Sequence, residues 1–244
     1  MFFPLGDTPN FPQKPYLTYC LIALNLGVFF LVLLPLAYTH PAPDSDLLAR
    51  YLQSLNLTAQ ETAHILPQIT RYDLLIHQYG FRPADPQLLT LFTSLFLHSG
   101  WGHILGNLLF LWIFGDNVEH RLGRIRYALL YFGTGIIGTF FFMQFVPGSQ
   151  TPLIGASGAI SGVLGYYFYT FSKNRVRVLV FLFPFVVNVF LIPSRILLGF
   201  YLVIGNILPF LVSVGATSGM AFGAHIGGFL AGLSFAWLGN RLTL

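Results

Sequence analysis

Long apolar runs separated by short polar breaks dominate the pattern along the chain. A helix that spans a bilayer needs about 20 predominantly apolar residues, and several runs approach that length. One of them is interrupted by the polar stretch HSGWGH. The pattern predicts an all-α polytopic membrane protein with six spanning helices. We expect these helices in 16–37, 88–114, 125–146, 157–171, 196–214 and 220–238.

A further apolar run, 176–192, fits a spanning helix poorly. It contains Pro184 and Asn188 and is followed by Pro193, so its uninterrupted apolar length is short. We interpret this run as an interfacial or re-entrant segment. A seven-helix bundle, in which the run also crosses the membrane, is the alternative.

Residues 38–90 differ from the rest of the chain. They hold five of the eight acidic residues, several prolines and amphipathic pieces such as DLLARYLQSL. This composition is typical of an extramembrane loop with short helices at the interface. We therefore expect a single membrane domain over 1–244. Its core would lie in 88–239, and the large loop would follow the first helix.

Composition and charge agree with a membrane protein. Only 8% of the 244 residues are charged, whereas soluble domains carry about 25%. The net charge of +4 predicts no nucleic-acid partner, because the basic side chains gather in short loops such as 121–126 and 173–177. Short basic loops stay in the cytoplasm. Six helices with both termini in the cytoplasm satisfy this rule.

The N-terminal stretch lacks the basic region that precedes the apolar core of a cleavable signal peptide. We expect an integral protein of the plasma or inner membrane. Cys20 is the single cysteine, so the chain forms no internal disulfide.

Two polar residues stand out, because polar side chains inside a membrane are costly and commonly mark function. Ser157 opens the fourth predicted helix, and His225 lies about one turn into the sixth. Stripes of small residues let helices approach closely. The pattern allows a serine nucleophile with a histidine base, and equally two packing seams with a hydrogen-bonded core histidine. Each residue heads such a stripe, with Ser161 and Gly165 on one helix and Gly228 and Gly232 on the other.

A second polar group opens the helix after the HSGWGH break. His103 and Asn107 are four residues apart and share one helix face. An imidazole and an amide side by side suit an oxyanion hole, although a polar network that fixes helix packing would look the same. His98 lies five residues before His103, off that face, and is expected to be structural.

The acids and lysines exclude other protease chemistries. No Asp or Glu follows Glu119, so neither an aspartyl protease nor the aspartate of a Ser–His–Asp triad fits. There is no HExxH motif, and no carboxylate or thiolate accompanies the histidines, so we expect no metal and no other cofactor. The two lysines, Lys14 and Lys173, stand at predicted cytoplasmic ends. A Ser–His dyad remains.

Three stretches together resemble the rhomboid intramembrane serine proteases. They are GASG at 155–158, AHIGGFLAG at 224–232 and HSGWGHILGN at 98–107, in the family's order and spacing. The resemblance implies a six-helix rhomboid-like bundle. It also implies cleavage of peptide bonds in or near transmembrane segments of other membrane proteins. The expected partners are such substrates and the lipid bilayer.

The resemblance also implies roles for individual residues. Ser157 would be the nucleophile, His225 the general base, and His103 and Asn107 the oxyanion hole, together with the Ser157 backbone amide. The neighbouring glycines, Gly155 and Gly158, belong to the serine motif.

A further stretch, GDNVEHRLG at 115–123, also resembles the family. There Glu119 and Arg121 would tie helix ends together on the cytoplasmic side.

The chain departs from the family pattern in two places. Many members carry an aromatic residue four positions after the nucleophile, stacked on the catalytic histidine. Ser161 occupies that position here, so another group must hold His225. The loop 38–90 also shows no clear Trp-Arg pair of the kind that some members have.

Two other functions compete with a protease. An inactive rhomboid-like scaffold would bind client transmembrane helices, but such relatives usually lack the serine or the histidine. A small transporter would need a membrane-embedded acid or lysine for ion coupling, and the apolar runs offer none.

Overall fold

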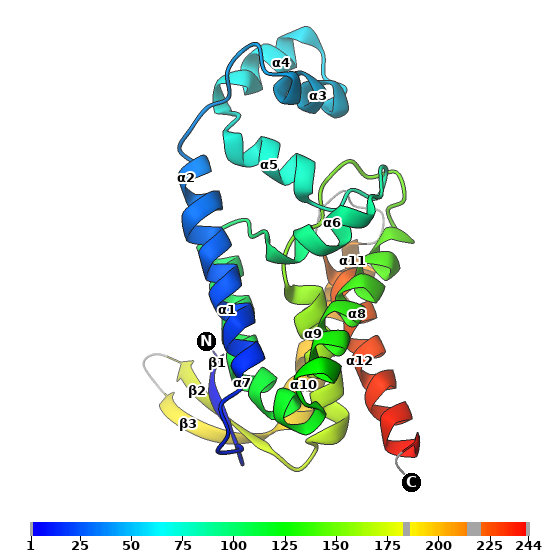
Figure 1. Ribbon diagram of the computed structural model, residues 1–244. Helices are drawn as coiled ribbons and strands as arrows, with labels where there is room; N and C mark the ends of the chain where they lie inside the picture. Colours follow the sequence, from blue (N-terminus) through cyan, green and yellow to red (C-terminus); the bar gives the residue numbers. More distant parts are fainter. Residues whose placement is uncertain (1, 183–185, 214–220, 243–244) are drawn as a thin grey trace.

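The computed structural model describes residues 2–182, 186–213 and 221–242, and it is mostly helical (Figure 1). Two of the long helices contain a π-helical turn, at Phe29–Leu33 and at Val203–Ile207. The helices of the bundle are α1 (Tyr16–Val28), α2 (Leu34–Leu36), α6 (Leu88–Thr93), α7 (Trp101–Leu122), α8 (Arg124–Met143), α9 (Ser157–Thr170), α10 (Ser194–Leu202), α11 (Leu208–Ser213) and α12 (Phe222–Leu242).

Four helical segments of the described residues are long and apolar enough to span a membrane. They are Tyr16–Leu36, Arg124–Met143, Ser194–Val212 and Phe222–Arg241. Leu88–Phe96 and Trp101–Leu122 meet at a bend of 90° and make a fifth candidate if they count as one span. The chain is therefore an integral membrane protein with four or five candidate spans, and the predicted count of six is not confirmed.

The short helix α9 lies in the middle of the bundle, between α8 and α12 (Figure 1). Ten of its 14 residues are buried. At about 1.5 Å per residue it is too short to cross a bilayer of about 30 Å unaided. Its surroundings are therefore protein rather than lipid along most of its length.

Close backbone contact joins α9 to α12. A Cβ atom on Gly228 would overlap the carbonyl oxygen of Gly158, and one on Gly232 would overlap that of Gly162. The small-residue stripe of α12 thus meets α9, as predicted. The contacting face of α9 is the glycine face, however, and Ser161 points to another neighbour.

A three-stranded antiparallel sheet lies at one end of the bundle (Figure 1), so the prediction of a wholly α-helical fold is wrong. The strands are β1 (Phe2–Thr8), β2 (Arg175–Leu182) and β3 (Val186–Pro193), in the order β1-β2-β3. The run 176–192 therefore forms most of a β-hairpin. It is neither a re-entrant helix nor a seventh spanning helix.

The sequence carries a signal for this hairpin. Val176, Val178 and Val180 are buried, whereas Arg175, just before them, and Arg177, between the first two, are exposed. Alternation with a period of two is typical of a strand with one buried face. The high apolar content of the run concealed this period.

Asp7 connects the sheet to the bundle. Its buried carboxylate accepts hydrogen bonds from Asn117 Nδ2 in α7 (2.7 Å) and from the Tyr167 hydroxyl in α9. Burial raises the pKa of Asp7 above its usual value of 3.8, although the hydrogen bonds from Tyr167 and Asn117 act to lower it. Strand β1 is therefore anchored on two helices of the core.

Glu119 joins the C-terminal end of α7 to the start of α1. Its carboxylate accepts hydrogen bonds from the backbone amides of Leu17 (2.9 Å) and Thr18 (2.8 Å). The first amides of a helix have no partner within the helix, and a negative charge there is favourable. The expected link between helix ends is present for Glu119. Arg121 takes no part in this link. Its side chain is exposed and makes no hydrogen bond or ion pair within the described residues.

The region 38–90 contains three short helices, at the end of the molecule opposite the sheet (Figure 1). Short helices are what the sequence predicts here. Leu48, Ile69 and Leu74 form a small core of their own. The helices are α3 (Asp46–Leu55), α4 (Ala59–Ile65) and α5 (Arg71–Tyr79).

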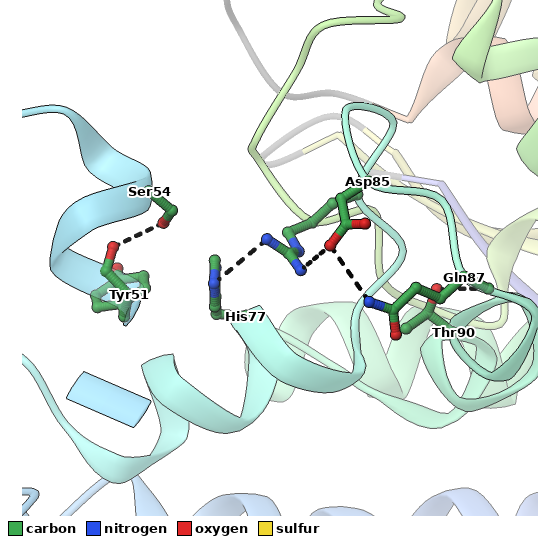
Figure 2. Close-up of polar contacts among 7 residues, drawn as sticks. Tyr51, Ser54, His77, Asp85, Gln87 and Thr90 are labelled. Atoms are coloured by element: carbon green, nitrogen blue, oxygen red, sulfur yellow. Dashed lines mark hydrogen bonds and ion pairs between the residues drawn. The ribbon is translucent and has the colours of Figure 1, made fainter. Parts of the chain in front are cut away.

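Polar contacts hold the chain where it returns from α5 to the bundle, and Figure 2 shows His77, Asp85 and Gln87 among them. Arg82 donates to Asp85 Oδ2 (2.7 Å) and lies 3.4 Å from His77 Nε2. Burial and the Arg82 charge lower the pKa of His77, despite the opposing effect of Asp85. Nε2 of a neutral His77 can therefore accept a hydrogen bond from the Arg82 guanidinium.

The same return segment pairs with the loop that leads to Ser157. Phe81 and Leu153 exchange backbone hydrogen bonds of 3.0 and 2.7 Å. The amide of Ala84 donates to the carbonyl of Ser149 (3.0 Å). The region of helices α3 to α5 is thus joined by main-chain bonds to the segment immediately before α9.

Gly232→Ala should destabilise the protein by roughly 1–3 kcal/mol, because the added methyl group has no room between the α9 and α12 backbones. Gly133→Ala in α8 is the matched control, since nothing lies within 4 Å of its Cβ position. It should change stability by no more than about 1 kcal/mol. Apparent melting temperatures in detergent measure both, and equal values for the two variants would contradict the packing described.

Candidate active site

Ser157 and His225 lie side by side in the structure. Ser157 is the first residue of α9, and His225 lies about one turn into α12. The distance between Ser157 Oγ and His225 Nε2 is 2.7 Å. That is within the reach of about 2.6–3.2 Å that a base needs to take a hydroxyl proton. The glycine contacts between α9 and α12 permit this approach.

The other ring nitrogen of His225 also has a partner. Asn206 Oδ1 lies 2.6 Å from His225 Nδ1, and Asn206 Nδ2 donates to the backbone carbonyl of Tyr201 (2.8 Å). Asn206 comes from the π-helical turn Val203–Ile207 and is only 1% exposed. Sequence reasoning missed it. The available signal was a lone asparagine within the apolar run 196–214, since a polar side chain in a membrane helix is costly.

Ser161, at the position where many family members carry an aromatic residue, has a different role. Its hydroxyl lies 2.7 Å from the hydroxyl of Tyr201. It thereby links α9 to α10. Among the described residues, Asn206 is therefore the side chain that hydrogen-bonds Nδ1 of His225, on the ring edge away from Ser157.

His103 and Asn107 flank the backbone just before Ser157. Gly155 has a φ of +116°, in the region that favours glycine. A Cβ atom there would come within 2.5 Å of His103 Nε2 and 3.7 Å of Asn107 Nδ2. The amide of Gly155 donates to the carbonyl of Ser94 (2.8 Å). Gly155 therefore allows the serine loop to lie directly against these two side chains.

Gly158 serves the site in another way. Its Cβ position would meet Ala224 at an ordinary distance of 3.6 Å or more. The part of Gly158 that matters is its carbonyl oxygen, which leaves no room for a Cβ atom on Gly228 of α12.

His98 belongs to the same polar group. It is fully buried, and Asn107 Nδ2 lies 2.9 Å from His98 Nε2. The rings of His98 and His103 pack edge to face, with centroids 5.0 Å apart. An amide nitrogen carries two hydrogens, so this bond orients Asn107 and leaves one N–H free for another acceptor. A structural role is expected for His98, and in the structure it holds the side chain of Asn107.

His103 has a partner besides His98. Its Nδ1 lies 3.1 Å from the hydroxyl of Ser99. Its other nitrogen, Nε2, is the one that faces Gly155. The ring is therefore held on the side away from the serine loop.

A cavity of about 10 Å³ adjoins Ser157, close to the volume that one water molecule needs. Small residues line much of it, including Gly135, Gly158 and Ala224. A much larger cavity of about 670 Å³ lies at the other end of α9, beside Arg121 and Thr170. That cavity is remote from the dyad.

In the described ranges, no group of three His, Cys, Asp or Glu side chains is arranged to hold a metal ion. The groups at the site are one hydroxyl, imidazole rings and amides. They can transfer a proton between oxygen and nitrogen and donate hydrogen bonds to a developing negative charge.

Comparison with known proteins agrees with these motifs. The family model of the Rhomboid domain matches residues 85–241. Rhomboid protein 1, mitochondrial, of Saccharomyces cerevisiae is 27% identical over 91% of this chain and 52% of its own length. Rhomboid protease GluP of Bacillus subtilis is 31% identical over 66% of this chain and 26% of its own. This chain thus spans about half or less of these two relatives.

Rhomboid protease GlpG of Haemophilus influenzae is 28% identical over 69% of this chain and 78% of its own length. A further match, in Arabidopsis thaliana, is named an inactive rhomboid-like protein. Several of the relatives are named proteases. The matched domain covers more than half of the chain and contains the serine, histidine and asparagine motifs. The chain therefore belongs to the rhomboid family.

Proposed function

We propose that this protein is an intramembrane serine endopeptidase that cleaves peptide bonds in or near transmembrane segments of other membrane proteins. The observation that carries the proposal is the 2.7 Å hydrogen bond between Ser157 Oγ and His225 Nε2. In a family with several named proteases, this pair supports a catalytic dyad.

The chemistry proceeds in two steps. His225 Nε2 takes the hydroxyl proton while Ser157 Oγ attacks the carbonyl carbon of the substrate, and the resulting tetrahedral intermediate collapses when His225 returns the proton to the leaving amine. Water then attacks the acyl-enzyme, gives a proton to His225 and releases the new carboxyl end. The proton returns to Ser157.

The negative oxygen of the tetrahedral intermediate needs donors nearby. His103 and Asn107 lie beside Gly155, two residues before Ser157. The backbone amide of Ser157 opens α9, and the first amides of a helix have no partner within it. These three donors form the oxyanion hole of the proposal.

The proposed architecture is a bundle of six spanning helices, five of them in the core over 88–239 and one formed by the first helix. In it, α9 counts as a spanning helix, the fourth in chain order, and its short length is compatible with the bundle because protein surrounds it. The region 38–90 is an extramembrane part of the same domain. Water reaches Ser157 from the N-terminal end of α9, which is the outer side in this topology.

The substrate is a transmembrane helix that becomes extended at the cut. Hydrogen bonds within a helix shield its peptide bonds, so the helix must unwind before a serine can attack. The small cavity beside Ser157 favours a small side chain next to the scissile bond.

The proposed orientation places both termini and the sheet in the cytoplasm, in a plasma or inner membrane. Arg124 and Arg126, in the first turn of α8, and the strand residues Arg175 and Arg177 are exposed. Basic segments of this kind stay inside. One similar relative is mitochondrial by name.

The alternative is an inactive scaffold that binds client helices, since one related protein is named inactive. The close Ser157–His225 pair argues against it, because a scaffold has no use for an activated hydroxyl. Reactivity of Ser157 separates the two.

Ser157→Ala should abolish cleavage of a reporter transmembrane substrate and labelling by a fluorophosphonate, with a loss of at least about a thousand-fold. His225→Ala should be equally inactive, and the double variant no worse, because the two residues act as one unit. Ser234→Ala, at an exposed serine of α12, is the control and should be fully active. Unchanged cleavage by Ser157→Ala in detergent would exclude the mechanism.

His103→Ala and Asn107→Ala should each lower the rate by roughly a hundred- to a thousand-fold, since each removes one of several oxyanion donors. Residual activity should exceed that of Ser157→Ala. Leu105→Ala, on the exposed face of the same helix, is the matched control. Full turnover by both variants would leave α7 with a structural role alone.

Cysteines placed at Gln150 and at Arg124, in a Cys20→Ser background, test the orientation. Both positions are exposed. An impermeant thiol reagent applied to intact cells should label the first and reach the second only after lysis. Labelling of position 124 from outside would reverse the topology.

A further inference from the structure

The contacts behind His225 concern how the dyad is held in its reactive form. We infer that Asn206 is a positioning residue of the active site, which fixes the tautomer and ring orientation of His225 through Nδ1. This inference rests on the proposed function, because it explains how the same dyad becomes competent.

The hydrogen bonds leave one orientation for the Asn206 amide. Its Nδ2 lies 2.8 Å from the backbone carbonyl of Tyr201. A carbonyl oxygen only accepts hydrogen bonds, so the amide nitrogen must face Tyr201 and the amide oxygen must face His225. The Tyr201 carbonyl, which can only accept, therefore fixes which end of the Asn206 amide is nitrogen and which is oxygen.

The orientation of the amide decides the protonation of the ring. Asn206 Oδ1 lies 2.6 Å from His225 Nδ1. An amide oxygen only accepts, so Nδ1 must carry the proton. A neutral imidazole then has a free lone pair on Nε2, which is the nitrogen that lies 2.7 Å from Ser157 Oγ. The main-chain carbonyl of Tyr201 thus acts through Asn206 to leave Nε2 as the basic nitrogen of His225.

Local structure explains how the asparagine reaches this place. Asn206 lies in the π-helical turn Val203–Ile207 and is 1% exposed, whereas Val203 and Ile204 beside it are 50% and 44% exposed. A π-helical turn contains one extra residue, and such turns are frequent at functional sites. The segment therefore presents apolar side chains outward and one amide inward.

A second contact holds this helix against α9. The Tyr201 hydroxyl lies 2.7 Å from Ser161 Oγ, one helical turn from Ser157. The Tyr201 ring also packs against Phe110, with centroids 5.7 Å apart. Tyr201 therefore positions Asn206 through its backbone while its side chain fixes the helix. Ser161 takes part in this indirect support, although it does not touch the histidine ring.

The arrangement matters most when the reaction begins. His225 gains a proton when Ser157 attacks, and its Nδ1–H bond to Asn206 then becomes a charge-assisted hydrogen bond. The amide thereby stabilises the protonated ring without itself carrying a charge. Among the described residues, His103 in α7 is a second titratable side chain close enough to act electrostatically on His225.

Three variants test the inference with the full-length protein in detergent. Asn206→Ala should lower kcat by about 10- to 100-fold, the effect of losing one buried hydrogen bond, with KM unchanged because Asn206 does not touch the substrate. Asn206→Asp should keep most of the activity, since a carboxylate also accepts from Nδ1. Ile204→Ala, an exposed residue of the same turn, is the control and should keep full activity.

The pH profile separates positioning from mere packing. A carboxylate at position 206 favours the protonated ring, so the acid limb of the rate should move to higher pH in Asn206→Asp. A packing role would leave the limb in place. An unshifted limb together with full activity of Asn206→Ala would overturn the inference.

A measurement without catalysis distinguishes this inference from the proposed function. In protein with 15N-labelled histidine, the shifts of the His225 ring nitrogens, assigned against His225→Gln, should show the proton on Nδ1. They should show a mixed population in Asn206→Ala. This tautomer in an inactive protein would reject the protease and keep the positioning role. The proton on Nε2 in the wild type, or no change in Asn206→Ala, would reject the positioning role itself.

Discussion

The contact between the backbones of α9 and α12 is the constraint on which the site depends. Helices in lipid gain little from hydrophobic burial and associate through close packing, which small residues permit. Gly228 and Gly232 lie against carbonyl oxygens of α9. Because Ser157 and His225 stand at the same end of these two helices, their separation of 2.7 Å follows from how closely the helices pack.

Buried polar groups connect the remaining elements to that pair of helices. In a membrane such groups must be satisfied within the protein. At one end of the bundle, Asp7 holds the sheet on α7 and α9. At the other end, Tyr201, Asn206 and His225 bring the segment Ser194–Val212 to the dyad. Buried hydrogen bonds therefore attach the sheet at one end of the bundle and position the candidate site at the other.

Helices α3 to α5 are also connected to the candidate site. The strand-like pairing of Phe81 with Leu153 joins them to the loop before α9. That loop ends at Gly155, whose positive φ and close contact with His103 leave no room for a side chain. The position of Ser157 thus depends on the main-chain pairing of Phe81 with Leu153 and on the close fit of Gly155 against α7.

The sequence by itself determined the membrane class and the rhomboid motifs, and it offered Ser157 and His225 as candidate partners, because apolar length and small-residue spacing are local properties. Tertiary structure alone decided the strand order of the sheet and the partner of His225. The alternation from Arg175 to Val180 predicts a strand without naming its neighbours. Asn206 stands out in the sequence as a lone asparagine in an apolar run, but its partner cannot be read there. The helix face that it occupies depends on one π-helical turn and on which helices pack around it. Hydrogen bonds between distant segments are set by that packing, and a one-dimensional pattern does not contain it.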